Sequence, residues 1–176
     1  MQSDLVEETP ETFLADVSLR RGAEGSLECV LPLILEQPVD AVWQALTASP
    51  ALPHWLAPGE IEPRLGGSVR IAFEVSGAAI ESEVAAWVPG ERLAYSWSSP
   101  GQPRRPVEWR LASSEVGVDL RLRLEVPAED DAARAFAGWS AHLQMLGAYL
   151  AGAPIGFPVP HFQEARSVLG ARLAEL

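Results

Sequence analysis

The chain has 176 residues, 48% of them hydrophobic, and a formal net charge of −11. This length and hydrophobic content predict one folded domain with a sizeable core, and they exclude an intrinsically disordered chain. The acidic charge argues against nucleic acid and against an anionic membrane surface as partners. All thirteen basic residues are arginine, so Schiff-base chemistry at a lysine is excluded.

The targeting and cysteine patterns point to a cytoplasmic protein. No apolar run reaches the roughly 18–20 residues that span a membrane, and the acidic segment 1–13 lacks the pattern of a secretion signal. Cys29 is the single cysteine and cannot form an internal disulfide. His54, His142 and His161 are too far apart for zinc-type spacing, so we expect no metal and no other cofactor.

The N-terminal third predicts a lead-in, a strand and two short helices. Residues 1–25 resemble a tail or an irregular lead-in, with a short edge strand at 13–19 as an alternative. Residues 27–35 alternate as a strand, and Pro32 within it places this strand near a sheet edge. Residues 38–58 carry apolar side chains at helical spacing, and Pro50 begins the second of two helices joined by a kink.

Five strand-like segments follow in series, at 68–75, 79–88, 92–98, 106–112 and 116–126. The last has the clearest alternation of apolar and charged residues. Turn signals between the segments are close enough for hairpins, which predicts an antiparallel meander. Each strand then has one buried and one solvated face.

A long helix should cover the buried face of this meander. Six residues form a broad apolar stripe at helical spacing: Ala132, Phe136, Trp139, Leu143, Leu146 and Leu150. Acidic residues 129–131 precede the helix, and Gly152 and Pro154 end it. Its opposite side is also apolar, so we expect a cover there. The cover is either a terminal helix at 161–176 or a second subunit. The second alternative predicts a homodimer through the back of helix 132–151.

Five segments occur in a familiar order: "VWQALTASPALPHW" (42–55), "LGGSVRI" (65–71), "EVAAWVPGERLAYSW" (83–97), "VEWRL" (107–111) and "GWSAHLQMLGAYLAG" (138–152). Together they resemble bacterial proteins similar to the C-terminal domain of the heat-shock-protein-90 ATPase activator. Those proteins belong to the START-related (SRPBCC) helix-grip superfamily. The chain lacks the arginine that the family often has in the first strand, and it lacks the threonine-rich pattern that often closes the last strand.

The resemblance implies an α+β helix-grip fold. A curved antiparallel sheet of about six or seven strands would wrap round a long C-terminal helix. Two short helices would follow the first strand, and an extra helix would end the chain. The expected organisation is a lead-in at 1–25, the helix-grip domain at 26–153 and a helical extension at 154–176.

A sheet that curls round a helix leaves a space between the two, which the superfamily generally uses as a ligand cavity. Large aromatic side chains can line such a cavity or fill a core, and both alternatives stay open for each residue. The expected ligand-binding residues are Trp55, Phe73, Tyr95, Trp97, Trp109, Trp139, His142 and Leu146. No catalytic residue is expected, because the sequence places no carboxylate to orient His142, and the strand neighbours of Cys29 are aliphatic.

Three functions remain as hypotheses. The first is non-catalytic binding of a small hydrophobic or amphipathic ligand in the cavity between the sheet and the long helix. The second is a protein-interaction module related to chaperone ATPase activation, which would show an exposed apolar patch. The third is a cyclase- or hydrolase-like enzyme that uses the same cavity, which requires polar groups that converge inside it.

Overall fold

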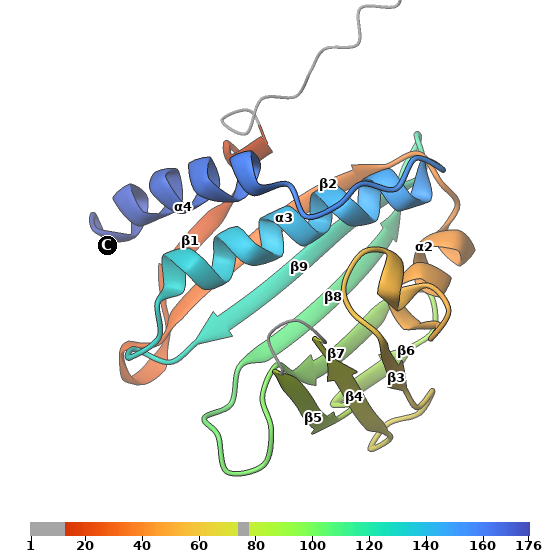
Figure 1. Ribbon diagram of the computed structural model, residues 1–176, viewed down its shortest axis with the longest axis horizontal. Helices are drawn as coiled ribbons and strands as arrows, with labels where there is room; N and C mark the ends of the chain where they lie inside the picture. The colour runs from red at the N-terminus through yellow and green to blue at the C-terminus, as the bar shows by residue number, and fades with distance from the viewer. Residues whose placement is uncertain (1–12, 74–77) are drawn as a thin grey trace, which may run out of the picture.

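Nine strands form two antiparallel sheets in the computed structural model, which describes residues 13–73 and 78–176 (Figure 1). The larger sheet has the order β1-β2-β9-β8-β7-β6. Its strands are β1 Ser18–Arg21, β2 Leu27–Leu35, β6 Ala86–Val88, β7 Arg92–Ser96, β8 Pro106–Ser113 and β9 Val118–Val126. The smaller sheet has the order β3-β4-β5, with β3 Gly59–Ile61, β4 Ser68–Ala72 and β5 Ala79–Glu83. The α+β class is confirmed, and the strands are divided between two sheets.

The alternating sequences of β2 and β9 determine the centre of the larger sheet. Cys29 lies opposite Leu124, and Trp109 of β8 lies opposite Leu122, so apolar side chains meet on the inner face. All four of these side chains are buried. Pro32, which has no N–H to donate, lies beyond the end of β1, because β1 pairs only with Leu27–Val30. The expected position of Pro32 near an edge is therefore confirmed.

The single strand predicted at 79–88 is wrong. The chain changes sheets in its middle: the backbone N–H of Val84 donates to Gly67, whereas that of Ala85 donates to Ala94. β5 therefore belongs to the small sheet and β6 to the large one. Alternation shows which side chains share a face, but it carries no information about which strand accepts the hydrogen bonds.

The small sheet includes β3, a strand that the sequence pattern did not predict. Gly59 begins it, and a Cβ atom there would lie only 2.6 Å from the backbone oxygen of Arg70, so the close approach of β3 to β4 requires glycine. The strand predicted at 68–75 ends at Ala72, and its residues 74 and 75 lie outside the described residues. This sheet forms one wall of the pocket described below.

The two predicted short helices are α2 Val39–Thr47 and the 3₁₀ turn η2 Leu52–His54. The second is thus a single turn rather than a helix from Pro50. The Trp55 indole N–H donates to the Ala45 carbonyl over 2.7 Å and holds the turn against α2.

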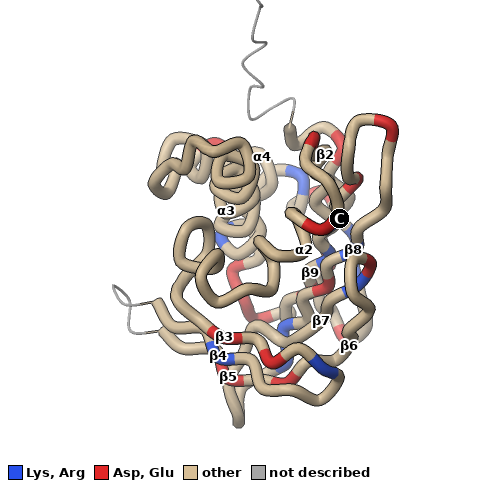
Figure 2. The backbone as a smooth tube through the Cα atoms, turned by 90° about the vertical axis from the view of Figure 1, so that its right-hand side faces the viewer, with Lys and Arg blue, Asp and Glu red and all other residues tan. Residues whose placement is uncertain are grey.

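The long helix α3, Ala132–Leu150, lies along the inner face of the large sheet (Figure 1, Figure 2). Asp131 caps its N-terminus by accepting a hydrogen bond from the Arg134 N–H. α4, Val159–Leu173, packs against α3 and buries Ala165 and Leu169 completely. The terminal helix of the same chain thus covers α3, and a homodimer through this face stays a prediction.

The expected lead-in at 1–25 is folded from Phe13 onwards, and residues 1–12 lie outside the described residues. Phe13, Leu14 and Val17 are buried in the core because α4 covers them. The Arg172 guanidinium of α4 donates to the carbonyl oxygens of Leu14 and Val17. The edge strand β1 therefore begins at Ser18, later than the alternative strand at 13–19.

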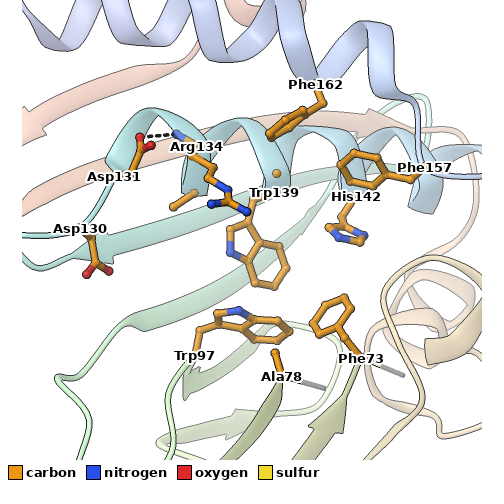
Figure 3. A pocket seen from close by; sticks show the side chains of 12 residues that line it. Phe73, Ala78, Trp97, Asp130, Asp131, Arg134, Trp139, His142, Phe157 and Phe162 are labelled. Carbon is orange, nitrogen blue, oxygen red and sulfur yellow. Dashed lines mark hydrogen bonds between the residues drawn. The ribbon is translucent and has the colours of Figure 1, made fainter. Parts of the chain in front are cut away.

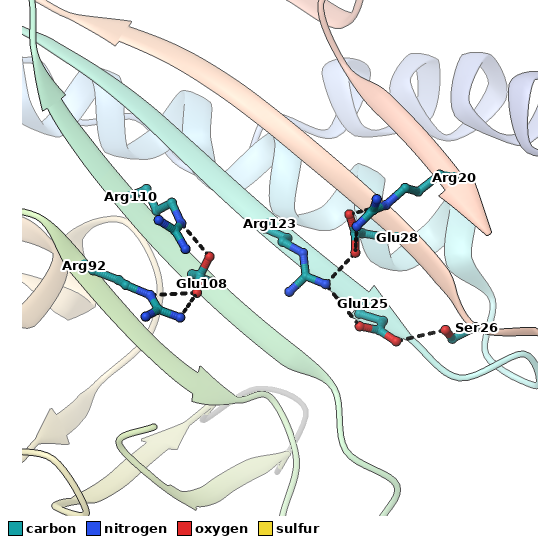
Figure 4. Close-up of polar contacts among 8 residues, drawn as sticks. All are labelled: Arg20, Ser26, Glu28, Arg92, Glu108, Arg110, Arg123 and Glu125. Carbon is teal, nitrogen blue, oxygen red and sulfur yellow. Dashed lines mark hydrogen bonds and ion pairs between the residues drawn. The ribbon is translucent and has the colours of Figure 1, made fainter. Parts of the chain in front are cut away.

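The outer face of the large sheet is ionic. Glu28 accepts hydrogen bonds from Arg20 and Arg123 (Figure 4). A second cluster, around Glu108 of β8, is built in the same way. Burial opposes ionisation of the Glu28 carboxyl, but the two guanidinium groups outweigh it and lower its pKa. Blue and red segments are accordingly interspersed along the strands in Figure 2. None of the helices in the described ranges is long and apolar enough to cross a membrane.

Candidate functional site

An open pocket of about 650 Å³ lies beside the N-terminal half of α3 (Figure 3). One face of α3 forms its wall, with Asp131, Arg134, Ala135, Gly138, Trp139 and His142. Phe73, which follows β4, Ala78, which precedes β5, and Trp97, which follows β7, form the opposite wall. Phe157 of the α3–α4 connection and Phe162 of α4 close one side. The pocket therefore joins segments from five parts of the chain.

The wall of this pocket is largely aromatic. The Trp97 and Trp139 rings meet edge to face with centroids 4.7 Å apart, and Phe73 packs against Trp97 at 5.8 Å. On the other side, Phe157 contacts His142 at 5.5 Å and Phe162 at 5.6 Å. Each ring is held by its neighbour, so the wall is preformed. Such a surface suits a flat or apolar molecule.

His142 presents a defined tautomer to the pocket. Its Nδ1 atom lies 2.8 Å from the Trp55 carbonyl oxygen, which can only accept, so Nδ1 carries the proton. Burial lowers the His142 pKa, and the hydrogen bond to Trp55 offsets this only in part. The neutral ring therefore keeps a lone pair on Nε2. Within the described ranges no carboxylate bonds to this ring, which leaves it without the orienting acid of a catalytic histidine.

Of the charged groups at the pocket, two are neutralised by arginines that do not line it. Asp130 forms a bidentate ion pair with Arg105, at 2.6 and 3.0 Å. Asp131 caps α3 and pairs with Arg166 at 3.0 Å. The Arg134 guanidinium forms no ion pair with any described residue, and it points along the helix toward Trp139 (Figure 3). Among the described residues, Arg134 is thus a cation of the pocket without a carboxylate partner.

The structure brings four of the eight expected site residues together: Phe73, Trp97, Trp139 and His142. The other four, Trp55, Tyr95, Trp109 and Leu146, are buried in the core and do not line the pocket. The space between sheet and helix is filled at that point, because Trp109 packs edge to face against both Trp55 and Trp139. Its indole N–H lies 3.4 Å from the Tyr95 hydroxyl, which accepts.

Sequence reasoning missed Arg134, Gly138, Phe157 and Phe162. Phe157 lies in a Pro- and Gly-rich connection, and Phe162 lies in the terminal helix α4, whose sequence gives no sign of which side chains face a pocket. A signal for the first two did exist. Arg134, Gly138 and His142 are spaced at i, i+4 and i+8, which places a cation, a gap and an imidazole in one line on the long helix.

Two other potentially reactive side chains, Ser140 and Cys29, are inaccessible. Ser140 Oγ lies 2.7 Å from His161 Nε2, but Ser140 is completely buried between α3 and α4. Burial raises the pKa of the Cys29 thiol to about 12, so it stays protonated. In the described part of the chain, no three His, Cys, Asp or Glu side chains are grouped to hold a metal ion.

Residues 36–151 match the family model described as activator of Hsp90 ATPase homolog 1-like protein. The chain belongs to this family. CalU16 from Micromonospora echinospora is 26% identical, with a TM-score of 0.72 over 88% of this chain and 94% of CalU16. EF2215 from Enterococcus faecalis, a conserved protein of unknown function, shares the fold at 16% identity. The match has a TM-score of 0.73 and covers 92% of this chain and 95% of the EF2215 chain.

A further solved structure in this comparison is DynU16, described as a putative protein in the dynemicin biosynthetic locus. It is 28% identical, with a TM-score of 0.64, and the match covers 71% of this chain and 48% of DynU16. No curated protein gives a significant match. The resemblance to the activator-like family that the sequence motifs predicted is thus confirmed. The family assignment gives the fold and leaves the function to be argued from the site.

Proposed function

We propose that this activator-like protein binds a small hydrophobic or amphipathic molecule in the pocket beside α3, without catalysis. The observation that carries the proposal is the preformed aromatic wall made by Trp97, Trp139, Phe73 and Phe157. A volume of about 650 Å³ lies within the range of small-molecule sites. Burial of a flat apolar surface against these rings supplies the driving force.

The polar groups of the pocket support binding better than catalysis. A hydrolase or cyclase needs an activated nucleophile or a general acid–base pair. His142 is held by a backbone carbonyl instead of a carboxylate, and Ser140 is buried away from the pocket. The relationship to DynU16 adds support for an organic small molecule, because that protein is described from a biosynthetic locus.

Two helical glycines provide a matched test. Gly138 and Gly147 both lie in α3, and a Cβ atom at either would meet nothing within 4 Å, but only Gly138 lines the pocket. Gly138→Leu should fill the pocket and weaken binding of 2-naphthol or palmitic acid at least tenfold, as measured by native mass spectrometry and calorimetry. Gly147→Leu should bind like the unmodified protein. The proposal would be overturned if neither probe bound to the unmodified protein. It would also be overturned if the two variants bound a probe with equal affinity.

A second candidate function is interaction with a chaperone, which the family description and one exposed patch favour. Ile155 and Val159, in and after the α3–α4 connection, are 45% and 49% exposed. If this patch docks on an Hsp90-type chaperone, the protein should raise the ATPase rate of the purified chaperone, and Ile155→Asp should abolish the increase. An unchanged rate would remove this candidate and leave the ligand proposal intact.

A further inference from the structure

We infer that the ligand is a flat aromatic acid that also carries a hydroxyl group. Its carboxylate pairs with the Arg134 guanidinium, and its hydroxyl donates a hydrogen bond to Nε2 of His142. This inference rests on the proposed function, because it assigns the two polar ends of the molecule that the aromatic walls hold. The observations concern the two ends and the space between them.

The acid end follows from the charges at the head of α3. Asp130 and Asp131 are each paired with an arginine from outside the pocket, so neither is left to bind Arg134. The Arg134 guanidinium is a planar fork that matches the two oxygens of a carboxylate. No described carboxylate pairs with this fork, so an acid provides the anion that a neutral ligand would lack.

The hydroxyl end follows from the tautomer of His142. Because Nδ1–H is committed to the Trp55 carbonyl, the ring can only accept a hydrogen bond at Nε2. The side chain lines the pocket between Phe73 and Phe157, so a donor must come from the ligand. A hydroxyl supplies one, while a second carboxylate at this end would face a lone pair.

The helix sets the spacing between the two ends. Arg134 and His142 are eight residues apart, which corresponds to about 12 Å along the axis. Arg134 points toward Trp139, which shortens this span (Figure 3). Gly138 lies between them and leaves the floor free of a side chain. A fused two-ring body that lies over Gly138, against the mutually contacting rings of Trp97 and Trp139, would extend toward both ends.

The test uses three related probes: 6-hydroxy-2-naphthoic acid, 2-naphthoic acid and 2-naphthol. Isothermal titration calorimetry on the full chain should give the tightest binding for the hydroxy acid. Each single-group probe should bind about five- to tenfold more weakly, the change expected for loss of one hydrogen bond at a partly exposed site. The same titrations are then repeated with two variants.

Each variant removes one end of the site. Arg134→Gln should weaken both acids about five- to tenfold and leave 2-naphthol unchanged. His142→Asn keeps a side-chain N–H for the Trp55 carbonyl but has no acceptor at the position of Nε2, so it should weaken 2-naphthol and the hydroxy acid and leave 2-naphthoic acid unchanged. Circular dichroism checks that both variants fold.

The outcomes separate this inference from the proposed function. If all three probes bind alike and neither variant changes their order, the assignment of the ends is wrong, while binding in the aromatic pocket stands. If none of the three probes binds, the inference is overturned, and the titration with palmitic acid decides whether the proposed function is overturned as well. The crossed pattern, in which each variant affects only the probes with the matching group, supports the inference, because a merely structural defect would weaken all three probes together.

Discussion

Ser140 of α3 and His161 of α4 share a hydrogen bond of 2.7 Å in the interface between the two helices. Ser140 is completely buried, and burial lowers the His161 pKa, so the neutral ring pairs with the hydroxyl. This bond lies behind the pocket wall. It holds α4, and with it Phe162, in place against α3.

Loss of either partner of this bond should destabilise the protein, because it strands the other partner. We expect Ser140→Ala and His161→Phe each to lower the free energy of unfolding by about 1–2 kcal/mol. The double variant should cost less than their sum by about 1 kcal/mol, since it leaves no unpaired group. Urea denaturation of the four proteins measures this, and strictly additive costs would contradict the role of the bond.

The protein should become less stable as the pH is lowered below about 6.5. Burial lowers the folded-state pKa of His142 and of His161, so the unfolded chain binds more protons just below the ordinary value of 6.5. The free energy of unfolding therefore rises with pH in this window, by up to about 1.4 kcal/mol per pH unit for each proton, and levels off above it. Denaturation at pH 5.0–7.5 should show this slope, and His142→Asn should reduce it. A flat profile would be inconsistent.

Glu28 should contribute measurably to stability from the outer face of the sheet. Its carboxylate is nearly buried and accepts from two guanidinium groups. Both arginines are partly exposed to solvent, so we expect Glu28→Gln to cost only about 1 kcal/mol at pH 7. The lowered pKa means that this contribution is present above pH 4.5 and is lost as the pH falls through the folded-state value.

The matched control for Glu28 is Glu81→Gln. Glu81 faces Arg70 across 4.0 Å with both side chains mostly exposed, so its removal should change stability by less than about 0.5 kcal/mol. Thermal unfolding of the two variants under the same conditions measures the loss of stability that each substitution causes. Equal costs would show that the enclosure of Glu28 by the arginines has no energetic effect.

Cys29 should report on opening of the core. The thiol is fully buried in β2, and its pKa of about 12 keeps it protonated at neutral pH. We expect no labelling by Ellman's reagent in the native protein at pH 8, and rapid labelling in denaturant. Modification of the native protein as fast as of a small-molecule thiol would mean that the sheet opens at this strand.

The sequence predicted the large sheet well where one face is apolar and the other charged. In β9, leucines alternate with arginines and acids, which leaves only one way to place the strand. The failures have a common cause. The switch of sheet at Val84 and Ala85 depends on which backbone groups accept their hydrogen bonds, and side-chain periodicity does not encode that choice.

The candidate site was predicted only in part, for a related reason. Periodicity indicates that Trp55 and Trp109 point inward, but it does not indicate whether the interior is filled. Their edge-to-face packing closes the space over the middle of α3 and leaves the opening at the flank. Phe157 reaches the pocket only because α4 turns back along α3, which is a tertiary contact that no local pattern specifies.

At Val84 and Ala85 the chain leaves the small sheet and enters the large sheet, on which the long helix lies. Phe73 and Ala78 directly flank β4 and β5 of the small sheet, so we expect the gap between them and α3 to depend on a backbone corner that does not line the pocket. Insertion or deletion of a residue at this corner would widen or narrow the mouth and leave every lining side chain unaltered. A change of chain length at this corner would thus alter the thickness of ligand that the pocket admits, and the residues that contact the ligand would stay the same.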